Sequence, residues 1–293
     1  MRQLGPVLVL FALGVLAQSP GGASVTLVPN YTAGEHLDYV ISMRTSIVGQ
    51  AQLRIAARAD MRILPGAAPG RFTAVLRFTR FHSSVQAANP ALRASLTRQA
   101  AATDRAALRM TPLRVQASAG AFRVLARAQG GVYDEPVEML SELARTDVLP
   151  SGPVAVGDSW TRVRHQAIPS VQADVTLTLD CRLSALGRFD HAPAATITLR
   201  SRGQANLAPG AIPASPALAA RGLVPTGSAT FDTTATSVYR TSDAVLERVT
   251  SVSHNGLVIR YVGPGPAEPP SDTEIDSSAT VTLVPAGGGS PAP

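Results

Sequence analysis

The chain has 293 residues and a net charge of +6, and all 26 of its basic residues are arginine. The absence of lysine excludes Schiff-base chemistry, a Ser-Lys dyad and the lysine of a phosphate-binding loop. Aromatic residues make up only 4% of the chain, which disfavours stacking on nucleic-acid bases, so we expect no nucleic-acid partner.

The N-terminus has the pattern of a secretory signal. A short basic start, Met1-Arg2-Gln3, precedes an apolar run over 4–16, and Val15-Leu16-Ala17 fits a small-residue cleavage site. Residues 1–17 are therefore predicted to be a signal peptide, with an uncleaved anchor as the alternative. The expected location is periplasmic or extracellular. Cys181 is the only cysteine, so the exported chain would depend on its core rather than on an internal disulfide.

Three alternating segments follow the signal. Residues 37–47 and 51–63 place apolar side chains on one face and polar, largely basic ones on the other, which is typical of half-buried strands. Leu53 and Ile55 lie on the apolar face of the second segment. After a turn at 65–70, residues 72–78 continue that face with Leu76. Short turns between the segments predict an antiparallel meander.

Two helices are predicted in this half. Asn89-Pro90 resembles an N-cap followed by proline at the first helical position, and 90–102 is rich in alanine. Residues 136–147 place apolar side chains on one face, with acids early and Arg145 late. The alternating segments 113–117 and 122–128 return to the sheet between the helices. An enclosed apolar cavity between the sheet and the 136–147 helix would be the most informative structural observation.

The stretch Val148 to Trp160 joins two β-rich halves, 18–147 and 148–262. Its prolines, Pro150 and Pro153, end the preceding helix and hold the linker extended. Gly157-Asp158 predicts a turn. Trp160, the only tryptophan, is expected to anchor the core of the second half.

The second half contains the clearest alternating run, 171–185. Leu177, Leu179, Cys181 and Ala185 share its apolar face, and Cys181 is predicted to be an inert buried thiol. A returning strand begins near Ala195. Residues 207–226 are interpreted as a mobile linker, with a functional lid as the alternative.

The C-terminal region is predicted to contain a hairpin and then a tail. Asn255-Gly256 is the strongest hairpin signal in the chain and joins 245–253 to 257–262. Residues 263–293 are rich in Pro, Gly and Ser and are predicted to be mostly disordered, with one short strand near 280–284.

The predicted fold class is mainly β with a minor α component. Long antiparallel curved sheets carry one or two short helices packed on them. Segments at an offset of about 122 residues align in phase, for example Gly34 on Gly157 with an offset of 123, which favours two duplicated half-barrels as one arrangement. Alternating sequences align easily by chance, so that arrangement stays open.

The middle of the chain resembles a class of bacterial exported β-rich proteins of unknown function. The resemblance is carried by Leu149-Pro150, Pro153-Val154, Val156-Gly157-Asp158 and Trp160. It implies no activity. At the level of architecture alone, the predicted fold is similar to periplasmic half-barrel carriers of lipids and lipoproteins.

The leading hypothesis is a non-enzymatic envelope protein that holds an apolar molecule such as a lipid in its curved sheet. The candidate ligand-facing residues are Leu53, Ile55, Leu76, Leu177, Leu179 and Trp160. One alternative is a structural or adhesive protein whose basic strand face contacts an anionic membrane, cell wall or polymer. A less favoured one is an esterase using Ser159 with His165 or His254, although Ser159 lacks the Asp-x-x-His partner of that class. The five histidines are isolated in sequence, so we expect no metal site, no catalytic residue and no cofactor.

Overall fold

The described part of the chain folds mainly into β-strands, as predicted, and three helices accompany them there. The computed structural model describes residues 23–118, 121–126, 135–168, 173–211, 214, 216–264 and 269–284, so the predicted signal peptide lies outside it. The strands are β1 Ser24–Val25, β2 His36–Ile47, β3 Ala51–Ile63, β4 Arg71–Ala87, β5 Leu113–Ser118, β6 Ala121–Ala126, β7 Val154–Ala155, β8 Ser159–Ile168, β9 Ala173–Phe189, β10 Ala192–Leu207, β11 Val224–Arg240, β12 Leu246–Val262 and β13 Ser271–Val284. The helices are α1 Pro90–Arg109, α2 Glu135–Leu143 and α3 Pro216–Ala220.

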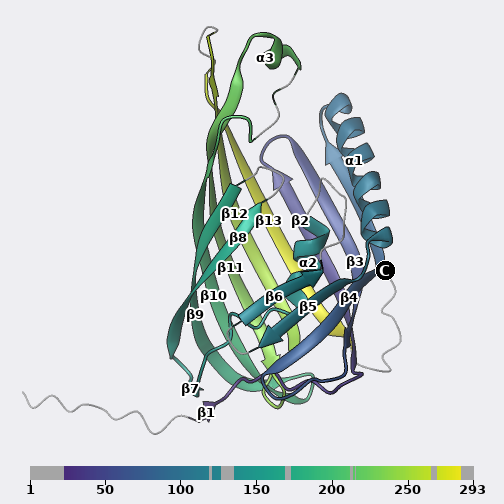
Figure 1. The fold of residues 1–293 in the computed structure, drawn as a ribbon, viewed down its shortest axis with the longest axis vertical. Coiled ribbons are helices and arrows are strands. Elements are labelled where there is room, and N and C mark those ends of the chain that lie inside the picture. The colour runs from purple at the N-terminus through teal and green to yellow at the C-terminus, as the bar shows by residue number, and fades with distance from the viewer. Residues whose placement is uncertain are drawn as a thin grey trace, which may run out of the picture.

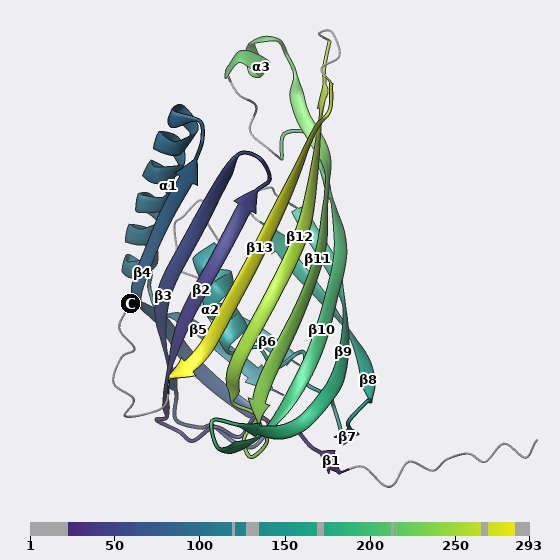
Figure 2. The same ribbon diagram turned by 180° about the vertical axis from the view of Figure 1, so that it is seen from behind.

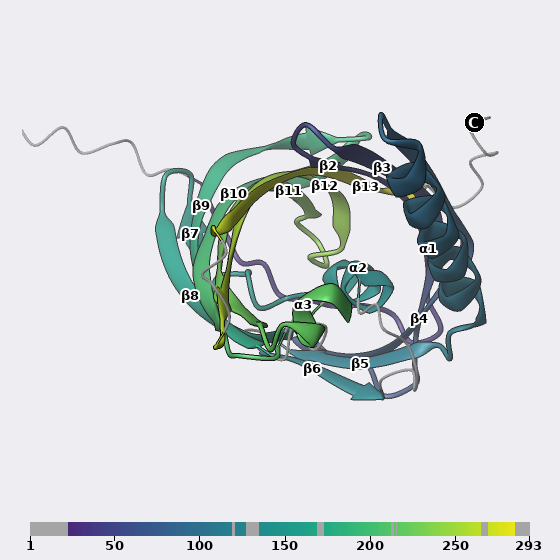
Figure 3. The same cartoon turned by 90° about the horizontal axis from the view of Figure 1, so that it is seen from above.

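One large antiparallel sheet contains 11 of the strands, in the order β6-β5-β4-β3-β2-β13-β12-β11-β10-β9-β8 (Figures 1 and 2). β1 and β7 form a separate two-stranded sheet. The large sheet curls around an interior that contains α2 (Figure 3). Its terminal strands, β6 and β8, do not pair with each other among the described residues, so the sheet stays open. The predicted fold class, long antiparallel strands in a curved sheet with short helices, is confirmed.

The predicted meander of the first half is confirmed in pairing and in phase. β2 pairs with β3, and β3 pairs with β4. The apolar residues at alternate positions of all three strands point to the inner face, where Ile55 and Leu76 are 2% and 0% exposed. Burial of one face fixes the register, because a slip of one residue would turn the whole apolar set outward.

The C-terminal tail contains a long strand, so the prediction of a mostly disordered 263–293 is wrong for 271–284. β13 lies in the middle of the sheet between β2 and β12. Its inner residues Val281 and Leu283 are each 8% exposed. The prediction failed because the prolines and glycines of 263–293 all lie outside 271–284, and pairing on both edges stabilises this Ser- and Thr-rich segment as a strand. Residues 265–268 and 285–293 lie outside the described part of the chain.

The hairpin predicted at Asn255-Gly256 is wrong. β12 runs without a turn through both residues, which pair with Phe231 and Thr230 of β11 and with Ile275 and Glu274 of β13. A type I′ turn would break both ladders at once. The long-range pairing therefore overrides the local turn signal.

Both predicted helices exist with different ends. The Asn89 side chain accepts hydrogen bonds from the backbone N–H groups of Ala91 and Leu92 at 2.9 and 3.2 Å, which confirms the N-cap. α1 continues past 102 to Arg109 because Thr103 and Ala107 face the sheet and are buried. α2 ends at Leu143 rather than 147, since Thr146 and Asp147 bond to β5 and β8 instead of continuing the helix. No helix of the described ranges has the length and apolar character needed to cross a bilayer.

The long strand of the second half is confirmed over Ala173–Phe189. Its inner face follows the predicted phase through Leu183, but Ala185 is exposed. A bulge in the pairing of β9 with β10 shifts the register between Ile197 and Thr196, which turns Ala185 away from the core. The predicted linker 207–226 is shorter than expected, because β10 reaches Leu207, β11 begins at Val224 and α3 lies between them.

The inner face carries two hydrophobic clusters within the continuous sheet. One is built on β2 to β5, β13, α1 and α2, and the other on β8 to β12 and the stretch around Leu149. Half-buried Val249 of β12 packs against both clusters. The offset noted in the sequence pairs the meander β2–β4 with the meander β8–β10, and internal duplication stays a prediction.

Candidate functional site

An apolar cavity of about 130 Å³ lies between α1 and the inner face of β2, β3 and β4. Its walls from the sheet and from α1 are mostly aliphatic. The lining consists of Thr45, Ile47, Ala51, Gln52, Leu53, Ile55, Ser83, Val85, Leu96, Gln99, Ala100 and Thr103. A concave apolar site with a few polar groups at its border is the usual form of a site for an apolar or amphipathic molecule.

The position of α1 creates this cavity. β5 pairs only with residues 71–76 of β4. Beyond residue 76, β4 still pairs with β3 on one edge, but the opposite edge has no strand beside it among the described residues. The Asp104 carboxylate of α1 accepts hydrogen bonds there from the Ser83 N–H at 3.0 Å and the Ser83 hydroxyl at 2.6 Å. This contact satisfies a backbone donor at the strand edge. It holds the helix over the sheet, while small residues such as Ala100 leave the space beneath it unfilled.

The predicted ligand-facing residues do not form one surface. Leu53 and Ile55 line the cavity under α1. Leu76 is fully buried in the first hydrophobic cluster, and Leu177 and Leu179 belong to the second. Trp160 is half-buried against the second cluster, and its indole N–H donates to the Val148 carbonyl at 2.9 Å. Contact of these six residues with a ligand stays a prediction.

A row of hydroxyl side chains crosses the inner face next to the cavity. Thr45, Ser277, Ser253, Thr233 and Ser201 are direct cross-strand neighbours on β2, β13, β12, β11 and β10. The Ser277 hydroxyl donates to Thr45 at 3.3 Å, and the Thr233 hydroxyl donates to Ser253 at 3.0 Å. Thr45 also lines the cavity, so a polar row begins where the apolar pocket ends.

The segment 145–149, which we term the bridge, connects the two ends of the open sheet. The guanidinium of Arg145 lies 5.0 Å from the ring centroid of Phe122 on β6, and the Thr146 hydroxyl donates to the Ser118 carbonyl on β5 at 2.9 Å. On the other side, the Arg162 guanidinium on β8 donates to the Leu149 carbonyl at 3.1 Å. The start of the stretch singled out in the sequence therefore joins the two halves.

Charged side chains reinforce the bridge. Arg164 of β8 donates to both carboxylate oxygens of Asp147 at 3.0 and 3.1 Å and lies 3.4 Å from Glu142. Only 12% of the Arg164 side chain is exposed. Burial alone would lower the pKa of this guanidinium, but the carboxylates of Glu142 and Asp147 outweigh burial and raise it. The pair is structural, because its charges are satisfied within the protein.

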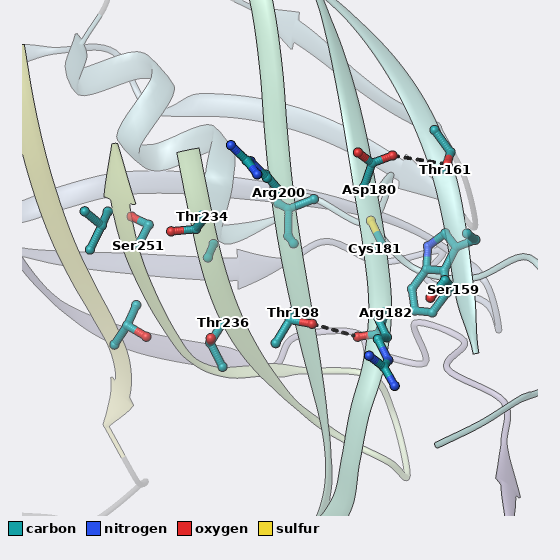
Figure 4. A pocket seen from close by; sticks show the side chains of 15 residues that line it. Ser159, Thr161, Asp180, Cys181, Arg182, Thr198, Arg200, Thr234, Thr236 and Ser251 are labelled. Atoms are coloured by element: carbon teal, nitrogen blue, oxygen red, sulfur yellow. Dashed lines mark hydrogen bonds between the residues drawn. The ribbon is translucent and has the colours of Figure 1, made fainter. Parts of the chain in front are cut away.

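A larger but polar groove of about 520 Å³ lies over the same sheet on β8 to β12 (Figure 4). Its side chains include Thr198, Thr234, Thr236 and Arg200, which Figure 4 labels. Two of the charged side chains that line it are paired, since Arg200 pairs with Asp232 and Asp180 pairs with Arg202. Arg200 donates to Asp232 at 2.6 and 3.1 Å, which lowers the pKa of that carboxyl. An exposed groove lined by charged and hydroxyl side chains is less suited to an apolar ligand than the cavity under α1.

The catalytic alternative does not acquire a suitable geometry. Ser159 and His165 both lie on β8, six residues apart, which is about 20 Å along an extended strand. His254 lies on β12 and pairs with Asp276 at 2.8 Å. Because β9, β10 and β11 lie between β8 and β12 in the sheet, neither histidine is in hydrogen-bond reach of Ser159. Among the described residues, no three His, Cys, Asp or Glu side chains gather as metal ligands would.

Burial raises the pKa of the Cys181 thiol to about 11, in agreement with the predicted inert buried cysteine. The thiol lies on the inner face of β9, opposite Trp160 and Leu199. A protonated thiol is a poor nucleophile and a poor metal ligand. Cys181 therefore packs as a small apolar side chain.

The contribution of α1 to the cavity was missed in the sequence. Leu96, Ala100 and Thr103 recur at the spacing of one helix face, which is a signal that the sequence does contain. The sequence instead directed attention to the space between the sheet and the second helix. There, Leu140 and Leu143 of α2 are 0% and 2% exposed and fill the space against the core.

No family model matches the chain, and no curated protein matches it. The resemblance of the Leu149 to Trp160 block to an exported family thus stays a prediction. The chain is similar to a solved structure described as "lipid-protein interactions in lipovitellin", with 12% sequence identity and a TM-score of 0.40. The likeness covers 89% of this chain and 26% of that chain. A likeness at this level gives no ground for assigning a ligand.

Proposed function

We propose that the protein is an exported, non-enzymatic carrier or holder of an amphipathic lipid. The observation that carries this proposal is the apolar cavity between α1 and β2–β4. The proposed ligand inserts part of its hydrocarbon chain there, against Leu53, Ile55 and Leu96.

The size of the cavity determines what it holds. An engineered cavity of about 150 Å³ holds one benzene molecule, so a cavity of about 130 Å³ accepts a short length of acyl chain. The rest of the ligand would extend along the inner face. There the half-buried hydroxyl row beginning at Thr45 provides hydrogen-bond partners for polar groups of the ligand.

Two further elements of the proposal rest on the sequence. The N-terminal pattern over 1–17 supports export to the periplasm or outside the cell. The distance between Ser159 and both candidate histidines supports a protein without hydrolase activity. A Ser159→Ala variant would keep all of any esterase activity found in the preparation.

Two measurements test the proposal. One is native mass spectrometry of the protein purified from the envelope of the cells that produce it, and the other is thermal unfolding in the presence of lauric acid. We expect a copurifying lipid and a rise in the midpoint of unfolding as lauric acid is added. The absence of both a bound lipid and a thermal shift would overturn the proposal.

A further inference from the structure

The basic charge of the protein is concentrated in one structural unit. Residues 36–109, which span β2, β3, β4 and α1, contain 11 arginines and 3 aspartates, a net charge of +8. The whole chain carries +6, so the remainder carries −2. Such asymmetry within one chain indicates a partner of opposite charge for the basic unit.

Within this unit, arginines face each other across neighbouring strands. Arg44 of β2 is the direct cross-strand partner of Arg54 of β3. Arg58 of β3 is the direct partner of Arg80 of β4. All four side chains lie on the outer face, opposite the hydrophobic cluster, and three of the four residues are exposed while Arg58 is half-buried. We term these four residues the basic surface.

Like charges directly opposite each other destabilise a sheet. In the second half of the sheet, arginines lie next to acidic residues instead. Arg200 and Arg202 of β10 form ion pairs with Asp232 of β11 and Asp180 of β9. Within the described part of the chain, none of the four residues of the basic surface forms an ion pair. Folding alone does not explain two adjacent arginine pairs, whereas an external anion would offset their repulsion.

We propose that the basic surface docks the protein on an anionic lipid membrane. Arg54 and Arg58 are four residues apart on β3, so the two arginine pairs are separated by about 13 Å along the strands. The surface can thus contact at least two phosphate groups at once, and each guanidinium can bind phosphate through two N–H groups. The three strands run side by side in Figure 2.

A membrane fits this surface better than a soluble polymer because an apolar side chain lies at its end. Val48, in the turn between β2 and β3, is 48% exposed. The neighbouring residues Ile47 and Ala51 line the cavity under α1. Docking would therefore bring the turn and the cavity close to the lipid phase. The inference does not depend on the proposed function, because an empty cavity leaves the outer charges unchanged.

The test measures sedimentation with phosphatidylcholine vesicles that contain or lack phosphatidylglycerol. The variant replaces Arg44, Arg54, Arg58 and Arg80 with glutamine. A matched control replaces four exposed arginines of β9, β10 and β12 with glutamine, namely Arg182, Arg202, Arg248 and Arg260. Both variants lower the net charge by the same amount. The two double variants, Arg44→Gln with Arg54→Gln and Arg58→Gln with Arg80→Gln, serve if the fourfold variant fails to fold.

We expect the protein to bind only the phosphatidylglycerol vesicles and to be released by high salt, which screens exposed charges. Each arginine near an anionic surface contributes about a fivefold factor to binding. The fourfold variant should therefore bind about six hundredfold more weakly, and each double variant about twenty-fivefold, while the control changes little. Equal losses in the fourfold variant and the control would overturn the assigned location. Retention on heparin without binding to vesicles would overturn the membrane as partner.

Discussion

The cavity under α1 can be filled from the helix side by Ala100→Phe. Ala100 lines the cavity, so the added ring would occupy the space proposed for the ligand. At about 24 cal/mol per Å³ of cavity, filling about 130 Å³ would stabilise the ligand-free protein by at most about 3 kcal/mol. Some of this gain is lost to imperfect fit of the ring. We expect a net stabilisation of about 1 kcal/mol or more, measured by chemical denaturation.

The same variant should lose its response to ligand. A ligand present at a hundred times its dissociation constant stabilises the native protein by about 2.7 kcal/mol. We expect the thermal shift produced by lauric acid to disappear in Ala100→Phe and to persist in Ala94→Phe. Ala94 is exposed on the same helix and is the matched control. An undiminished shift in Ala100→Phe would refute the assignment of the cavity as the binding site.

Three other predictions concern the fold. Arg164→Met removes one of the two arginine partners of Asp147 and Glu142, the other being Arg145. Because the Arg164 side chain is 12% exposed, we expect a loss of up to about 3 kcal/mol in the free energy of unfolding; the exposed Arg200→Met is the control, and similar losses in both would contradict the structural role of the bridge. Because burial raises the pKa of the Cys181 thiol to about 11, its contribution to stability should be present below the unfolded pKa and decline as pH rises above about 9. Thiol labelling at pH 8 should accordingly be slow in the folded protein and fast in urea, and rapid labelling of the folded protein would count against burial. Deletion of residues 269–293 removes β13 from between β2 and β12, and we expect loss of the native circular-dichroism spectrum and aggregation through the exposed strand edges; a folded monomer would show that β13 is dispensable.

Much of the sheet was predictable because burial of one face leaves a two-residue period in the sequence. β2, β3 and β9 carry this period clearly, and their inner residues Ile55, Leu177 and Leu179 lie where it predicts. The N-cap at Asn89 was also predictable, since its side chain acts on the next turn only.

The failures share a physical cause, which is pairing between segments distant in sequence. β13 joins β2, so residue 277 pairs with residue 45 across more than two hundred positions. Local composition contains no information about that partner. For the same reason, Asn255-Gly256 forms part of a central strand although it is a strong local turn signal.

The candidate site was only half predictable. Leu53 and Ile55 followed from the strand period, but the opposite wall of the cavity depends on where α1 lies. That position is fixed by the bonds between Asp104 and Ser83, two polar residues whose meeting no periodicity predicts. For the bridge, the sequence did indicate that 148–160 connects the two halves. It did not indicate the contacts of Arg145 and Arg164, which hold that connection in place.

Photolabelling with a fatty acid that carries a diazirine on its terminal carbons tests the central claim most directly. After irradiation, digestion and mass spectrometry, we predict labels on peptides that contain Leu53 of β3 and Leu96 of α1, and competition by unlabelled lauric acid. Two results would contradict the proposed binding of a hydrocarbon chain between α1 and the sheet. One is labelling confined to the groove on β8 to β12 around Thr198 and Thr234, and the other is labelling spread over the protein that unlabelled lauric acid does not reduce.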